Sequence, residues 1–127
     1  MQRILLGILA AATLGSGTAI AHHSPIVFDR TRQVTLTGVV TEFKWGNPHS
    51  WIHIDVANDD GQVASWGIEM NPANNLVRAG WRSTTLKPGD QVTVVVYPLR
   101  NDEKGGQYVS IKLPDGTVLG ERESGVL

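Results

Sequence analysis

The chain has 127 residues, no Cys, and 11 Lys and Arg against 12 Asp and Glu, which gives a formal net charge of −1. That length suits a single domain, and the balanced charge argues against nucleic acid as a partner, because phosphate binding needs a basic surface. The absence of Cys excludes disulfides, thiolate nucleophiles and Cys-ligated zinc sites. Metal or acid–base chemistry must therefore come from His, carboxylate or Met side chains.

The first 21 residues are typical of a cleaved signal peptide. A basic start precedes an apolar run, Ile4–Leu14, and Ala19-Ile20-Ala21 matches the small-x-small motif of a signal-peptidase site. The run is short for a membrane span, so we expect a periplasmic or secreted protein with no membrane association after cleavage. The expected organisation is a signal peptide at 1–21, an N-terminal arm at 22–32 and one β-barrel domain at 33–127.

Three β-strands are predicted in the first half of the domain, where Val, Ile and Thr alternate with polar residues between turn residues. Their expected ranges are Gln33–Trp45, His49–Val56 and Gln62–Met70. In the first strand the apolar residues change face, and we expect a β-bulge at Gly38. In the second, alternation places His49, Trp51 and His53 on one face and Ser50 on the other.

A short helix and further strands follow. Asn71 as N-cap, Pro72 as the first helical residue and Gly80 as the stop predict the helix. The remaining strands are expected at Gln91–Tyr97, Tyr108–Leu113 and Val118–Leu119, with a charged loop at 101–106. Three strands, a helix and then further strands is the order of an all-β, five-stranded Greek-key barrel of the OB type. A generic meander or sandwich is the alternative.

All four His residues lie in two places, which suggests a metal site. His22 and His23 would begin the mature chain, and the second strand carries the other pair. After cleavage at Ala21, the α-amine and imidazole of His22 can chelate one ion, and another imidazole completes a planar three-nitrogen set suited to Cu(II). Binding would weaken as pH falls, because protons compete for the same nitrogens. We expect copper, with zinc as the alternative metal.

Strand geometry ranks the other candidate ligands. His49 and His53 are four strand positions apart, which separates their Cα atoms by about 13 Å, so a regular strand does not bring both to one ion. His49, beside the turn at Asn47-Pro48, is the preferred third ligand, and His53 is a packing residue or a ligand for something else. Met70 is a lesser candidate, because its strand parity favours the core. The carboxylates expected to orient the imidazoles are Asp29, Asp55 and Glu69.

Two other functions compete with that of a non-catalytic metal carrier or buffer. One is an OB-type module that binds a small molecule, peptide or partner protein without metal, with Trp51 and Trp45 as candidate ligand surface. The other is a copper oxidase, which ranks last because one small domain offers little substrate surface. Enzymatic activity is therefore not favoured, and we expect a monomer or small homo-oligomer.

Several motifs together resemble one family of small exported bacterial proteins that is classified as a domain of unknown function. They are HHS at 22–24, VTLTG at 34–38, WGNPH at 45–49, LKPGD at 86–90 and LPDG at 113–116. The resemblance covers nearly all of the expected mature chain and implies export and a single small β domain. It implies no reaction. Two of the motifs contain His22, His23 and His49, which favours the metal hypothesis.

Overall fold

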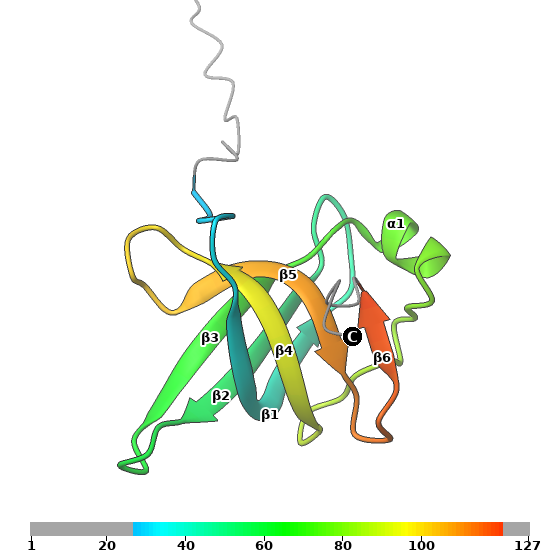
Figure 1. Cartoon of the computed structure of the whole chain (residues 1–127). Coiled ribbons are helices and arrows are strands. Elements are labelled where there is room, and N and C mark those ends of the chain that lie inside the picture. Colours follow the sequence, from blue (N-terminus) through cyan, green and yellow to red (C-terminus); the bar gives the residue numbers. More distant parts are fainter. Residues whose placement is uncertain (1–26, 121–127) are drawn as a thin grey trace, which may run out of the picture.

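A computed structural model describes residues 27–120, which form a small β-barrel with one short helix (Figure 1). The elements are β1 (Val34–Lys44), β2 (Trp51–Ala57), β3 (Val63–Glu69), α1 (Ala73–Arg78), β4 (Gln91–Pro98), β5 (Gly105–Lys112) and β6 (Val118–Gly120). Within this range, no helix has the length and apolar character needed to cross a membrane. The predicted signal peptide and residues 22–26 of the predicted arm lie outside the described residues.

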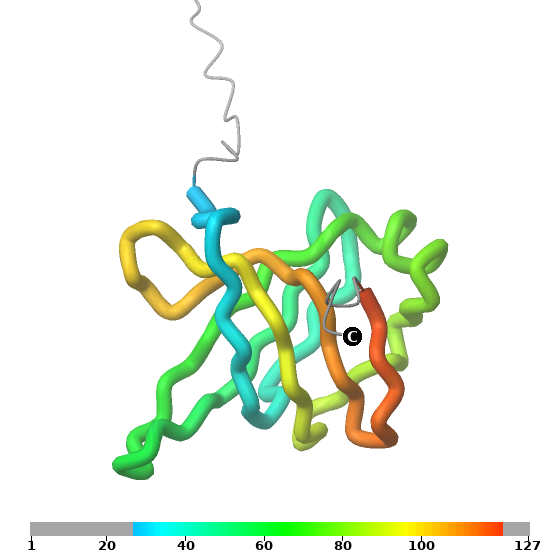
Figure 2. Tube along the Cα trace, in the orientation of Figure 1, coloured from blue at the N-terminus to red at the C-terminus, as the bar shows by residue number. Residues whose placement is uncertain are grey.

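The strands form one sheet that closes on itself. Their order is β3-β2-β1-β4-β5-β6, and a parallel pairing between β3 and β5 completes the barrel. The closure is short and joins residues 67–69 to residues 105–107. A five-stranded closed barrel with a helix between β3 and β4 has the OB arrangement, so the predicted fold class is confirmed. The sixth strand, β6, extends the sheet beyond β5 (Figure 2).

The long strand β1 pairs with two neighbouring strands, and this requires it to bend. Its first half pairs with β4 and its second half with β2, and the register shifts between Val40 and Glu42. The predicted bulge at Gly38 is therefore wrong, since Gly38 pairs regularly with Val92. The inward face changes only after Val40, which is 1% exposed. Gly38 is needed for a different reason, because a Cβ there would clash with the carbonyl oxygen of Asp55 on β2.

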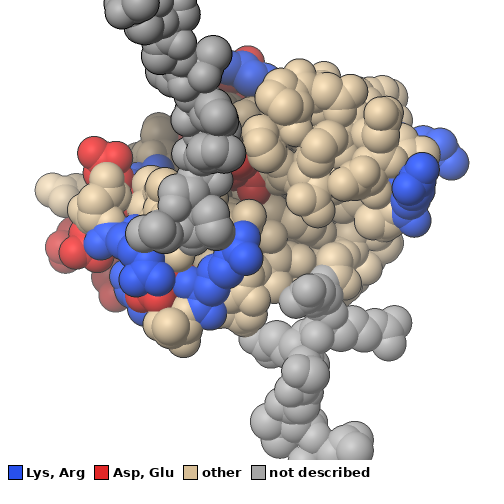
Figure 3. Space-filling view, turned by 90° about the horizontal axis from the view of Figure 1, so that it is seen from above, with Lys and Arg blue, Asp and Glu red and all other residues tan. Residues whose placement is uncertain are grey.

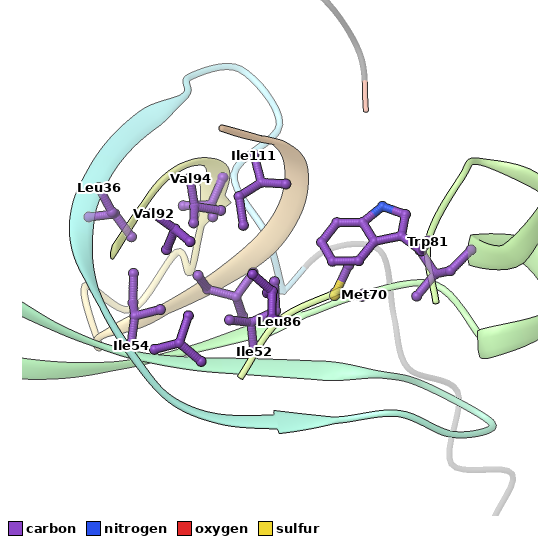
Figure 4. Close-up of a cluster of buried hydrophobic side chains, with 13 residues drawn as sticks. Leu36, Ile52, Ile54, Met70, Trp81, Leu86, Val92, Val94 and Ile111 are labelled. Carbon is purple, nitrogen blue, oxygen red and sulfur yellow. The ribbon is translucent and has the colours of Figure 1, made fainter. Parts of the chain in front are cut away.

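The core consists of the inward faces of the strands and of residues that close one end of the barrel. In β2 the predicted alternation is confirmed, because Ser50, Ile52 and Ile54 are fully buried. The buried apolar cluster comprises Leu36, Val40, Ile52, Ile54, Ile68, Met70, Leu76, Trp81, Leu86, Val92, Val94, Val96 and Ile111. Trp81 and Met70 lie together at one end of this cluster (Figure 4).

The helix α1 ends in a Schellman motif that directs Trp81 into the barrel. The Gly80 N–H donates to the Val77 carbonyl at 3.2 Å, and the Trp81 N–H donates to the Leu76 carbonyl at 2.9 Å. Gly80 has φ +92°, so the predicted stop is confirmed. The predicted start is one residue early. Pro72 is the N-cap, and the Asn71 carbonyl accepts from the Ser50 N–H at 3.3 Å, outside the helix.

Strand β5 begins earlier than its sequence indicates. Gly105 and Gly106 resemble loop residues, yet they pair with Gly67 and Ile68 of β3. A Cβ at Gly106 would lie 2.8 Å from the Tyr97 carbonyl oxygen, so this close approach of strands requires glycine. A Cβ at Gly105 would lie 3.3 Å from the Gly67 carbonyl oxygen of β3, so both of these glycines lie where β5 closely approaches a neighbouring strand.

Candidate functional site

His49 lies in the connection between β1 and β2, two residues before β2 begins. The neighbouring residue Ser50 fixes this connection to the strand end of β3, because its carbonyl accepts from the Met70 N–H at 2.8 Å. Its hydroxyl accepts from the Gly46 N–H at 3.1 Å. The segment before β2 therefore has a defined backbone position, although the predicted strand start at His49 is two residues early.

The His49 imidazole is oriented by two oxygen atoms. Its Nδ1 lies 3.0 Å from the Met70 carbonyl oxygen and 3.2 Å from Glu69 Oε1. Both atoms are acceptors, so Nδ1 carries a hydrogen, and in the neutral ring the lone pair is then on Nε2. The side chain of His49 is 31% exposed, whereas that of Glu69 is only 14% exposed. The structure thus brings together two residues that the sequence singled out, His49 and Glu69.

His53 lies on the outer face of β2, apart from these acceptors. Its ring stacks on that of Trp51, with centroids 6.3 Å apart and an interplanar angle of 16°. Gly67 of β3 lies beneath them, and a Cβ there would be 3.7 Å from His53 Cε1. Trp51 is partly exposed, but Trp45 packs edge-on against Phe43 beside the core. Of the two predicted ligand-surface residues, Trp51 is therefore the one on the outer wall of the barrel.

The other predicted residues have different partners. Asp55 accepts a hydrogen bond from Ser65 Oγ at 2.6 Å. Asp29 accepts from Thr31 and contacts Arg32 Nε at 3.1 Å, and the hydrogen bonds from Thr31 lower the pKa of the Asp29 carboxyl. Met70 is buried in the core, as its parity predicts, so its carbonyl rather than its thioether faces His49.

The described part of the N-terminal arm is attached to the loop between β4 and β5. Phe28 pairs with Leu99, and the Asp29 N–H donates to the Pro98 carbonyl at 2.8 Å. Charged side chains gather on one side of the barrel end viewed in Figure 3, and much of the rest of that face is uncharged. One charged contact in this region joins Arg32 to Asp102 of the β4–β5 loop at 3.6 Å.

A pocket that the sequence did not indicate lies between the arm and the barrel wall. Its volume is about 290 Å³, and its lining residues are Arg30, Glu69, Met70, Asn71, Tyr97, Gln107 and Tyr108. Arg30 Nε donates to Gln107 Oε1 at 3.1 Å, which holds the arm over β5. Tyr108 faces inward and donates to the Leu119 carbonyl at 2.9 Å, and burial raises its pKa to about 12.

Residues 27–120 do not by themselves assemble a group of three His, Cys, Asp or Glu side chains that could hold a metal ion. His22 and His23, the first two predicted ligands, lie outside the described residues. Any ion bound at His49 must therefore take ligands from another part of the chain, from solvent or from a second molecule.

Comparisons with known proteins place the chain in a family. It is similar to the mitochondrial single-stranded DNA-binding protein of S. cerevisiae, with 15% identity and a TM-score of 0.46 over 65% of this chain and 93% of that chain. No curated protein matches it significantly. The sequence pattern of DUF6152, a family of unknown function, matches residues 10–108. The chain therefore belongs to the DUF6152 family of unknown function, in agreement with the resemblance drawn from its motifs.

Proposed function

We propose that this protein is an exported copper-binding protein that acts as a carrier or buffer. The α-amine and imidazole of His22 and the Nε2 atom of His49 would hold the ion, with His23 as a further imidazole near the same site. The observation that carries the proposal is the pair of acceptors on His49 Nδ1, the Met70 carbonyl at 3.0 Å and the Glu69 carboxylate at 3.2 Å.

This environment is the one that a metal-ligating His requires. Such a residue almost always donates its second ring N–H to a carboxylate or carbonyl, which fixes its tautomer and raises its basicity. His49 has both kinds of acceptor, whereas His53 stacks on Trp51. That difference favours His49 over His53 as a ligand.

The length of the arm permits the proposed ligand set. Arg30 lines the same pocket as Glu69, and Glu69 contacts His49. Seven residue steps separate His23 from Arg30, and an extended chain spans up to about 3.3–3.6 Å per residue, or roughly 25 Å in total. A planar set of nitrogen ligands suits Cu(II), and Cu(II) also binds such ligands more tightly than Zn(II) does.

The decisive experiment is a Cu(II) titration of exported, mature protein whose N-terminus has been verified by mass spectrometry. We expect one ion per chain, and we expect His49→Ala to weaken binding by at least about 100-fold, because loss of a ligand costs more than the roughly 10–100-fold typical of an outer partner. His53→Ala is the matched control and should leave the affinity unchanged. Equal affinity of the wild type and His49→Ala would exclude the proposed site.

The N-terminal contribution has its own test. Three extra Ala residues placed before His22 separate the α-amine from both imidazoles and leave neither His at the third position of the chain, where a four-nitrogen chelate would form, so we expect weaker Cu(II) binding with the fold intact. Binding should also weaken from pH 8 to pH 5, because amine and imidazole nitrogens must lose protons to coordinate. If the extended chain binds Cu(II) as tightly as the wild type, the terminal chelate is not part of the site.

Glu69 provides a second, graded prediction. Glu69→Ala removes one of the two acceptors on His49 Nδ1 and leaves the Met70 carbonyl in place. We therefore expect Cu(II) affinity to fall by about 10-fold, the lower end of the range for outer partners of a ligand. A competition titration against a chelator of known affinity measures this change. Asp55→Ala is the control, since Asp55 contacts Ser65, and a drop of similar size in that variant would contradict the assignment.

A further inference from the structure

The outer wall of the barrel carries a transverse row of polar and aromatic side chains beside the His49 site. The registers place Trp51 opposite Glu69, Glu69 beside Gln107, and Gln107 opposite Tyr97. The row therefore crosses four strands, β2, β3, β5 and β4, at spacings of about 4.8 Å. Arg30 of the arm lies over its Gln107 end, where Nε donates to Gln107 Oε1 at 3.1 Å.

The pocket formed by this row and the arm contains opposite charges that do not neutralise each other. Arg30 and Glu69 both line it, yet within residues 27–120 no ion pair joins them within 4 Å. The Nε of Arg30 is used by Gln107, and a guanidinium has further N–H donors on its Nη atoms. The Glu69 carboxylate can accept more hydrogen bonds than the one from His49 Nδ1.

We propose that this pocket binds a small zwitterion, with a carboxylate on Arg30 and an ammonium group on Glu69. A simple anion would be repelled by the negative charge of Glu69, and a simple cation would be repelled by the positive charge of Arg30, so only a ligand with both charges complements both sides. The planar fork of a guanidinium matches a carboxylate. Asn71, Gln107 and Tyr97 supply neutral hydrogen-bonding groups at the same surface.

The size of the pocket restricts the ligand further. Its volume of about 290 Å³ is just below the roughly 300–1,000 Å³ of small-molecule pockets, so it suits a very small ligand. A free amino acid or a comparably small amino acid analogue matches this volume. The inference goes beyond copper binding and does not depend on it. The copper site uses His49, whereas the carboxylate of the zwitterion would bind Arg30, and Glu69 takes part in both proposals.

The test is calorimetric titration of metal-free mature protein, kept in a chelating buffer, with glycine, β-alanine, 4-aminobutyrate and 6-aminohexanoate. Acetate and methylammonium serve as single-charge controls. We expect at least one of the four zwitterions to bind at least 10-fold more tightly than either control, and the preferred length reports the separation of the two charged groups. Absence of binding by all four, or equal binding of acetate, would overturn the proposal.

Variants assign the two charged contacts. Arg30→Gln and Glu69→Gln should each weaken binding of the preferred zwitterion by at least 10-fold, whereas Arg78→Gln, on α1 and outside the pocket, should have no effect. An unchanged affinity in Arg30→Gln would overturn the assignment. Arg30→Gln should also leave Cu(II) affinity unchanged, so failure of the zwitterion site and failure of the copper site give different results. Unchanged far-ultraviolet circular dichroism confirms that each variant is folded.

Discussion

Replacing Trp81 with alanine is expected to lower the free energy of unfolding by about 3–5 kcal/mol, the usual cost of removing a buried large aromatic side chain. Trp81 is 0% exposed and closes one end of the barrel core. Its ring lies 5.8 Å from that of Phe43 and 5.5 Å from that of Tyr108, between centroids. The substitution removes the contacts with Phe43 of β1 and Tyr108 of β5 together. The hydrogen bonds of the Schellman motif hold the backbone at position 81, so the chain does not move in to fill the cavity.

Urea unfolding followed by circular dichroism measures this effect without relying on Trp fluorescence. Trp81→Phe keeps an aromatic ring in the cavity and should cost clearly less than Trp81→Ala. Trp51→Ala is the surface control, because Trp51 is partly exposed on the outer wall, and it should cost no more than about 1 kcal/mol. A Trp81→Ala variant within 1 kcal/mol of the wild type would show that Trp81 does not close the core.

Gly38→Ala is expected to destabilise the barrel by about 1–3 kcal/mol, although it adds only one methyl group. A Cβ at Gly38 would overlap the Asp55 carbonyl oxygen and lie 3.1 Å from Val56 Cγ2. The oxygen belongs to backbone rather than to a flexible side chain. The neighbouring pair of Val39 and Asp55 keeps β2 close to β1 at this point, so the strain cannot relax by a local side-chain movement.

Gly46→Ala is a matched control for Gly38→Ala. A Cβ at Gly46 would have no atom within 4 Å, so its substitution should change the free energy of unfolding by less than about 0.5 kcal/mol. The same urea titrations compare the two variants. If both have the same stability, the close approach of β1 and β2 is not what requires glycine at position 38.

Much of the fold was predictable from the sequence because burial follows strand parity. Alternation in β2 identified the buried set, and the order of strands and helix identified the OB-type barrel. Two local predictions were wrong for one physical reason. The bulge near Thr41 and the early start of β5 at Gly105 both depend on how strands far apart in sequence meet, and a glycine by itself does not say whether it marks a bulge, a loop or a close approach.

The candidate site was predictable only in part. His49 could be singled out by its position beside a turn, and Glu69 was one of three possible carboxylates. The Met70 carbonyl was not predictable, because backbone acceptors carry no sequence signal. The pocket was missed altogether, since Arg30 and Gln107 are 77 residues apart and meet because the arm docks on residues 98–99. The parallel pairing of β3 and β5 then brings Glu69 beside Gln107.

The sequence alone determined the family, the all-β composition of the domain and the inward or outward direction of most strand residues. These properties are local, because side-chain alternation and turn chemistry act over a few residues. Only the tertiary structure decided that Glu69 rather than Asp29 or Asp55 contacts His49, and that Arg30 shares a pocket with Glu69. The pairing of β2 with β3 places Glu69 opposite Trp51 and so beside His49. Barrel closure and the docking of the arm on residues 98–99 bring Arg30 to the same pocket, because they fix how segments far apart in the chain meet.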